Sequence, residues 1–309
     1  MNSIKILASG MYLPEEKIEN SYFKDIFNID DNWIYQRTGI KNRYWTKDEK
    51  TSELAIKAVQ NLKDTNGNIN IQDIDLIIVA STNYETTMPG ISFEIQKEFD
   101  IENCMCMDIS AGCSGYINGI DIARKYLELD EVKNALVVGV EKLSKYIDRN
   151  DINTAILLGD GAGATLLSKS LNKMYAKNIE SIGQEGEILT AKENEKIKMD
   201  GKKIYKFGTV RVAENIKTLV HKENLSIENI KYIIPHQSNI RIMESMANKI
   251  GATSEQMYIN ISDVGNIFNA SIPIALDQVI KNKLLKENDK IILVGYGGGL
   301  NLGSILIEI

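Results

Sequence analysis

The chain has 309 residues, of which 43% are hydrophobic and 25% are charged, a balance that is typical of a globular protein and excludes disordered, collagen-like and coiled-coil proteins. The formal net charge of −6 argues against nucleic acid as the main partner, and no apolar run approaches the roughly 20 residues of a membrane span. The three cysteines, an odd number between residues 104 and 113, form no disulfide framework, so we expect a cytoplasmic protein with reduced thiols.

The first predicted element is a strand within residues 1–14, where one lysine and a broken apolar stretch match a signal peptide poorly. A helix follows over 51–62, which opens with a Ser/Thr cap and carries apolar residues at helical spacing. Continuous apolar runs at 75–80 and 135–140 predict strands that helices cover on both faces.

The second half of the chain shows the same kinds of element. Strands are predicted at 231–235 and 290–295, and a helix at 239–250 is expected to end at Gly251. The stretch 170–207 is rich in Lys, Glu and Gly, and we interpret it as excursions over the surface.

An internal repeat relates the two halves. Residues 71–78 match residues 227–234 at four of eight positions, 156 residues further on, and the same offset places 136–139 on 292–295. The repeat predicts a duplicated domain, with two α/β halves packed as layers of helix, sheet, helix, sheet and helix.

Cys113 is the first candidate for chemistry. It lies at a predicted turn from a strand to a helix, where helix-terminal amides favour a thiolate and lower the thiol pKa. The alternative is a small buried hydrophobic residue, as is common for cysteine and as we expect for Cys104 and Cys106. A Cys-x-Cys pair with no nearby histidine is a weak metal signal.

His236 is the second candidate, because it directly follows an apolar strand at the edge where α/β sheets carry their sites. From its position alone, a structural histidine is an equal alternative. The only other histidine, His221, lies at a predicted helix end among charged residues, which favours a solvated role.

Asn266 follows a glycine before a predicted helix, a pattern that is also typical of a capped turn. The glycines of 295–300 let backbone amides approach a ligand, or simply form a tight turn. Residues 159–164 are Gly-rich but lack the ending of a phosphate loop, so no nucleotide site is predicted there.

Six motifs together resemble β-ketoacyl-acyl carrier protein synthase III, of the thiolase superfamily. They follow the order of that family from about residue 5 to the C-terminus, and they are 33–40, 111–115, 159–164, 235–239, 265–273 and 297–299. The resemblance implies the duplicated five-layer α-β-α-β-α thiolase fold, with one half over 1–168 carrying the nucleophile and the other over 169–309 carrying His and Asn. It also implies a catalytic triad of Cys113, His236 and Asn266.

The reaction implied by this resemblance is a decarboxylative condensation. Cys113 takes an acyl group from acyl-CoA, and a malonyl thioester on acyl carrier protein then loses carbon dioxide and attacks the acyl-cysteine. His236 and Asn266 would stabilise the enolate, and the amides of Cys113 and Gly298 would form the oxyanion hole. No metal or cofactor is implied, since acyl-CoA is a substrate.

The resemblance also assigns the binding residues. Trp33, Arg37 and Asn239 match positions that contact coenzyme A and pantetheine, and three cations match positions that dock the carrier protein, namely Lys206, Arg241 and Lys249. From sequence alone these cations could equally form a solvated face. Ile152 stands where the family has a second adenine-contacting arginine, and Arg149 is a possible substitute.

Relatives of this kind are two-fold dimers, and the resemblance implies that Met88 reaches the acyl pocket of the partner subunit. The alternative for Met88 is a core position within its own subunit. An alternative function is also open: an acyltransferase or a polyketide- or quinolone-type synthase on the same scaffold. A non-catalytic binding subunit is disfavoured by the complete triad.

Overall fold

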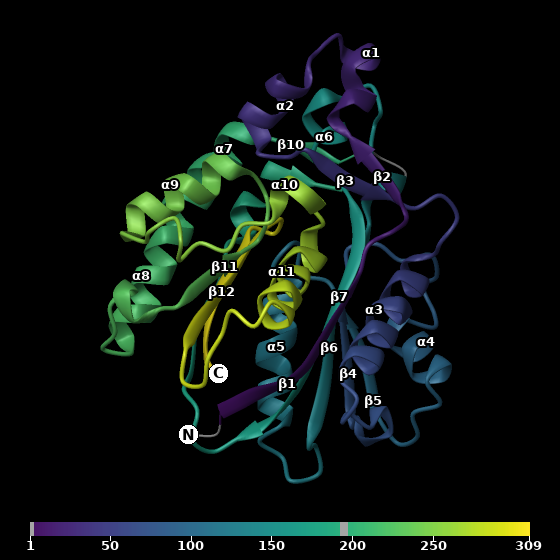
Figure 1. Ribbon diagram of the computed structural model, residues 1–309, viewed down its shortest axis with the longest axis vertical. Helices are drawn as coiled ribbons and strands as arrows, with labels where there is room; N and C mark the ends of the chain where they lie inside the picture. Colours follow the sequence, from purple (N-terminus) through teal and green to yellow (C-terminus); the bar gives the residue numbers. More distant parts are fainter. Residues whose placement is uncertain (1–2, 192–196) are drawn as a thin grey trace.

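Two large β-sheets and three layers of helices form the body of the structure, a computed structural model that describes residues 3–191 and 197–309 (Figure 1). The first sheet has the strand order β1-β7-β6-β4-β5, with β4 parallel to both of its neighbours. Its strands are β1 (Ser3–Tyr12), β4 (Leu76–Ala80), β5 (Met105–Ile109), β6 (Asn134–Lys142) and β7 (Asp160–Ser170). Strand β5 is therefore an edge strand.

The second sheet has the order β11-β12-β13-β8, with only the β11–β12 pair parallel. Its strands are β8 (Tyr175–Ser181), β11 (Tyr232–Pro235), β12 (Lys290–Gly297) and β13 (Asn301–Glu308). Strand β8 corrects the interpretation of 170–207 as surface excursions, because it forms the edge of this sheet. Within that stretch, residues 192–196 lie outside the described part.

Helices cover both sheets and separate them (Figure 1). Helices α3 (Thr51–Thr65) and α4 (Ile91–Glu98) cover the outer face of the first sheet, and α8 (Val212–Lys222) and α9 (Ile240–Ile250) cover that of the second. Between the sheets lie α5 (Gly115–Tyr126) and α11 (Ser271–Lys281). The predicted five-layer α/β fold is confirmed.

Short elements complete the described chain. The strands among them are β2 (Glu16–Glu19), β3 (Asn42–Trp45), β9 (Leu189–Thr190) and β10 (Lys198–Met199). The helices are α1 (Lys24–Phe27), α2 (Asp31–Thr38), α6 (Ile152–Ala155), α7 (Gly201–Lys206) and α10 (Ile261–Val264). Within the described residues, no helix has the length and apolar character needed to cross a bilayer.

The sequence repeat corresponds to a structural one. Helices α5 and α11 begin at residues 115 and 271, which keeps the 156-residue offset, and a short 3₁₀ turn precedes both β4 and β11. The assignment of the two halves to 1–168 and 169–309 stays a prediction.

Two glycines at this offset bring each central helix against the sheet of the other half. A Cβ atom on Gly139 of β6 would lie 2.1 Å from the backbone oxygen of Asn269, just before α11. A Cβ atom on Gly295 of β12 would lie 3.0 Å from the Cα of Ser114, just before α5. Because any side chain would push these helix starts away, glycine at both positions holds the two loops together at the centre of the molecule.

Candidate active site

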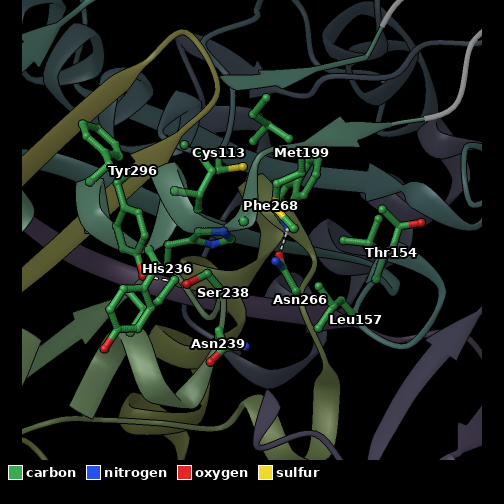
Figure 2. A pocket seen from close by; sticks show the side chains of 18 of the residues that line it. Cys113, Thr154, Leu157, Met199, His236, Ser238, Asn239, Asn266, Phe268 and Tyr296 are labelled. Atoms are coloured by element: carbon green, nitrogen blue, oxygen red, sulfur yellow. Dashed lines mark hydrogen bonds between the residues drawn. The ribbon is translucent and has the colours of Figure 1, made fainter. Parts of the chain in front are cut away.

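Three of the predicted residues, Cys113, His236 and Asn266, line one cavity of about 290 Å³ (Figure 2). They come from three separate segments: the turn between β5 and α5, the turn after β11, and the loop between α10 and α11. Figure 2 shows the cysteine sulfur, the imidazole ring and the amide group pointing toward a common space. The fold thus brings together side chains that are far apart in the sequence.

Cys113 lies in a tight turn that packs against the glycines after β12. Gly112 has a φ of 54°, and a Cβ atom there would lie 2.2 Å from the carbonyl oxygen of Gly298. The Cys113 side chain is only 3% exposed. Burial raises the pKa of the thiol to about 12, and the charge of Glu141 adds to this, while backbone amides of Gly298 and Cys113 oppose it.

The sequence-based expectation of a lowered Cys113 pKa is therefore wrong in direction. The expected amides are present at the sulfur, but the loss of solvation of a buried thiolate outweighs them. The resting residue is a thiol.

His236 is fixed by the end of β11. Its backbone N–H donates to the carbonyl of Val294 at 2.7 Å. The next side chain, Gln237, is fully buried, donates to the carbonyl of Pro235 and accepts from the N–H of Asn260. Burial lowers the pKa of His236 to about 3, so the ring is neutral near pH 7. Among the described residues, its Nδ1 atom has no hydrogen-bond partner.

A tyrosine and a serine that the sequence analysis missed flank this histidine. The ring of Tyr296 meets that of His236 edge to face, with centroids 5.5 Å apart, and its hydroxyl is 2.6 Å from that of Ser238. Both residues line the cavity. Tyr296 lies in a motif that was noted only for its glycines, and Ser238 lies in one that was noted only for His236.

Two backbone hydrogen bonds fix Asn266 to the segment that follows α6. Its N–H donates to Leu157 at 3.0 Å, and its carbonyl accepts from Gly159 at 2.9 Å. The side-chain Oδ1 accepts a hydrogen bond from the amide of Phe268 at 3.2 Å, which leaves the Nδ2 group as the donor that faces the cavity (Figure 2).

One mouth of the cavity carries Arg37, Asn239 and Arg241. The guanidinium of Arg37 lies 3.9 Å from the ring centre of Trp33, and its backbone oxygen accepts from Asn239 Nδ2 at 3.0 Å. Arg241 donates to the backbone oxygen of Gln36 through Nε and Nη2. These bonds fasten α2 to the start of α9, so Arg37 and Asn239 lie together at one rim of the cavity, and Trp33 packs against Arg37.

At position 152 the structure has an apolar side chain where the resemblance leads us to expect an arginine. Ile152 is half-buried in an apolar cluster that includes Trp33. The guanidinium of Arg149 lies 5.5 Å from the Trp45 ring centre and donates to the Tyr22 hydroxyl, and its role as a substitute arginine stays a prediction.

A second cavity, of about 390 Å³, reaches Cys113 from the side of Gly298 and Thr82. Met88 is 84% exposed, so the alternative of a core position within its own subunit is wrong. Lys206 and Lys249 are exposed, and so is His221 in the last turn of α8. Within the described residues no group of three or more His, Cys, Asp or Glu side chains is placed to hold a metal.

Comparison with known proteins supplies a family. Models of 3-oxoacyl-[acyl-carrier-protein] synthase III and of its C-terminal part match residues 107–183 and 220–309. A β-ketoacyl-[acyl-carrier-protein] synthase III of Clostridium botulinum is 40% identical over 99% of both chains, and one of Clostridium acetobutylicum is 36% identical over 100% of this chain and 99% of the relative. The crystal structure of the synthase III of Aquifex aeolicus superposes with a TM-score of 0.95 at 34% identity, covering 99% of this chain and 100% of the other.

Proposed function

The chain belongs to the 3-oxoacyl-[acyl-carrier-protein] synthase III family of condensing acyltransferases, and from this premise we propose that Cys113, His236 and Asn266 carry out its reaction at the cavity. The observation that supports this most directly is that all three side chains, from three segments, line one cavity. The substrates are an acyl-CoA and a malonyl group on acyl carrier protein.

In the first step, the Cys113 sulfur attacks the thioester carbon of acyl-CoA and the bond from that carbon to the coenzyme sulfur breaks. The proton of the thiol ends on the coenzyme thiol, so this exchange needs no net base. Backbone amides of Cys113 and Gly298 both approach the sulfur, and we assign them to the oxyanion of the tetrahedral intermediate.

In the second step, the malonyl carboxylate leaves as carbon dioxide and the electron pair of the broken bond forms an enolate. The enolate carbon attacks the acyl-cysteine, and the Cys113 sulfur leaves and regains a proton. A neutral His236 and the Nδ2 group of Asn266 are hydrogen-bond donors suited to the enolate oxygen. Asn266 has no basic atom, so its role is electrostatic.

The rim of the cavity supports the assignment of the pantetheine entrance. Arg37, stacked on Trp33, and the neighbouring Asn239 would contact the coenzyme. Arg241 at this rim and the exposed Lys206 and Lys249 would attract an acidic carrier protein.

When the protein is incubated with a panel of acyl-CoAs, we expect its intact mass to rise by one acyl group. Subsequent addition of malonyl-acyl carrier protein should release that mass and form a β-ketoacyl product. If no acyl-CoA adds mass, or if malonyl-acyl carrier protein does not discharge the acyl-enzyme, this function is rejected.

The edge strand β5 supports a homodimer. Apolar side chains are exposed along this edge of the first sheet, including Met105 on β5, Phe93 on α4 and Met88 in the preceding loop. An unpaired strand edge with apolar side chains favours pairing with a second copy. We place the acyl chain in the second cavity and Met88 of the partner subunit at its far end.

Replacing Met88 with tryptophan should block long acyl chains selectively, because a rigid ring fills space to which a flexible methionine adapts. The measurement is the acylation rate with acetyl- to octanoyl-CoA, with sedimentation to establish the dimer. Leu171→Trp is the matched control, since Leu171 is also exposed, at 72%, in the turn between β7 and β8. An unchanged chain-length profile, or a monomer, would contradict the assignment.

A further inference from the structure

Glu141, near the end of β6, is a fully buried carboxylate behind the candidate nucleophile. Only uncharged groups are found as its hydrogen-bond donors in the described chain. Thr82 donates its N–H to both carboxylate oxygens at 3.2 and 3.3 Å and its hydroxyl at 2.8 Å, and the Nδ2 group of Asn83 donates as well. Asn269 donates its Nδ2 group to Oε1 at 2.7 Å. Burial raises the pKa of Glu141 to about 7 although these donors oppose the shift, so the carboxylate is fully charged only above neutral pH. An amide in its place would set a further N–H group against the same donors.

Through Asn269, this carboxylate is linked to the helix that follows Cys113. The Oδ1 atom of Asn269 accepts from the backbone N–H of Tyr116 in the first turn of α5, at 3.2 Å. A Cβ atom on Gly115 would lie 2.7 Å from the same oxygen, so the contact is close. Asn269 itself belongs to the loop that carries Asn266. One buried acid therefore connects two of the segments that carry the proposed triad.

Through Thr82 and Asn83, Glu141 also holds the base of the loop that carries Met88. Thr82 lines the second cavity together with Cys113. Asn83 Oδ1 accepts from the N–H of Lys142, which fixes this loop to β6 a second time.

We propose that Glu141 is a positioning residue for the condensation: its carboxylate fastens the Cys113 turn, the Asn266 loop and the base of the Met88 loop to β6. It contacts no substrate and acts through Asn269 and Thr82. This inference rests on the proposed function, because it assumes that the aligned segments carry acyl transfer and decarboxylation.

The charge of Glu141 supplies a readout that a purely structural residue would not change. Its negative charge raises the pKa of the Cys113 thiol, second only to burial. Removing that charge should therefore shift the pH midpoint of Cys113 alkylation downward. The charge of Glu141 also raises the pKa of Tyr84.

The test compares Glu141→Gln with Asp160→Asn. Asp160, at the start of β7, is an equally buried carboxylate whose oxygens accept from backbone N–H groups of Thr46 and Ser144, both at 2.8 Å, and not from any of the three segments. The Glu141→Gln substitution sets an amide N–H group against the existing donors, which weakens the attachment of the three segments. Single-turnover acylation should therefore fall by about tenfold or more, with the apparent KM for acyl-CoA unchanged. The alkylation midpoint should fall as well. Asp160→Asn should change neither.

A double-mutant cycle identifies the route. If Glu141 acts through Asn269, Glu141→Gln and Asn269→Ala together should slow acylation little more than one of them alone. Additive effects, or equal effects of Glu141→Gln and Asp160→Asn, overturn the proposal. Should Glu141→Gln fail to fold, Asn269→Asp breaks the same link by removing its donor, and wild-type rates in that variant overturn it too. Failure of the proposed function is distinct, because then the wild-type protein itself would not acylate.

Discussion

Cys113→Ser should leave a folded protein that no longer takes up an acyl group from acyl-CoA. Serine preserves the size of a side chain that is 3% exposed, but its hydroxyl is a much weaker nucleophile than a thiol. The structure provides no hydrogen-bonded base to activate it, since the neutral His236 ring forms no hydrogen bond to Cys113 within the described residues. Intact-mass measurement after incubation with acyl-CoA gives the result directly.

Cys104→Ser and Cys106→Ser are the controls. Both cysteines lie half-buried at or just before β5, with their sulfur atoms 3.7 Å apart, and neither lines a cavity with Cys113. They should acylate like the wild type. Acylation of the Cys113 variant, or its loss in either control, would assign the nucleophile elsewhere.

His236→Ala and Asn266→Ala should each slow malonyl decarboxylation on the order of 100-fold or more, which is the usual cost of removing one oxyanion donor. Acylation of Cys113 should survive better, because its oxyanion is assigned to backbone amides. Because burial lowers the pKa of His236 to about 3, the histidine is deprotonated well below neutral pH. We therefore expect no inflection from it between about pH 5 and 8.

Asn266→Asp is the sharper variant of this pair. It keeps the shape and the oxygen that accepts from Phe268, but it replaces the Nδ2 donor with a negatively charged oxygen. An enolate should be destabilised at least as much as by alanine. Release of carbon dioxide from malonyl-acyl carrier protein, followed alongside acylation, separates the two half-reactions, and an equal loss in both would reject the division of labour.

Much of the architecture is predictable from local pattern. Apolar runs at 75–80 and 290–295 were long enough to identify buried strands, and both are observed as β4 and β12. The repeat between 71–78 and 227–234 predicted that β4 and β11 occupy equivalent places in the two halves, because equally buried strands need similar apolar side chains.

Strand β8 could not be found in this way. It is an edge strand, with Ala176 as its one buried residue and polar side chains over much of the rest. A strand that is half exposed needs no continuous apolar run, so its composition resembles that of a surface loop. Its identity is decided by pairing with β13, far along the chain.

The candidate triad was predictable from motifs, but its electrostatics were not. Whether amides or burial dominate the pKa of Cys113 depends on how completely the cavity excludes water, which no local pattern records. The same holds for Glu141, whose partners Thr82 and Asn269 lie 59 and 128 residues away. A single acid at the end of an apolar strand was the only sequence signal.

The duplication gives the two halves equivalent turns before their central helices, and these two turns have different roles. Cys113 and Asn269 lie 156 residues apart, each two residues before a central helix. The turn in the first half carries the reactive sulfur. The equivalent turn in the second half carries the amide group of Asn269, which holds the first turn through the N–H of Tyr116. Each half thus completes what the other lacks. We therefore expect neither half to be active when it is expressed alone. A substitution at Asn269 should cause the same kind of defect as a substitution in the Cys113 turn.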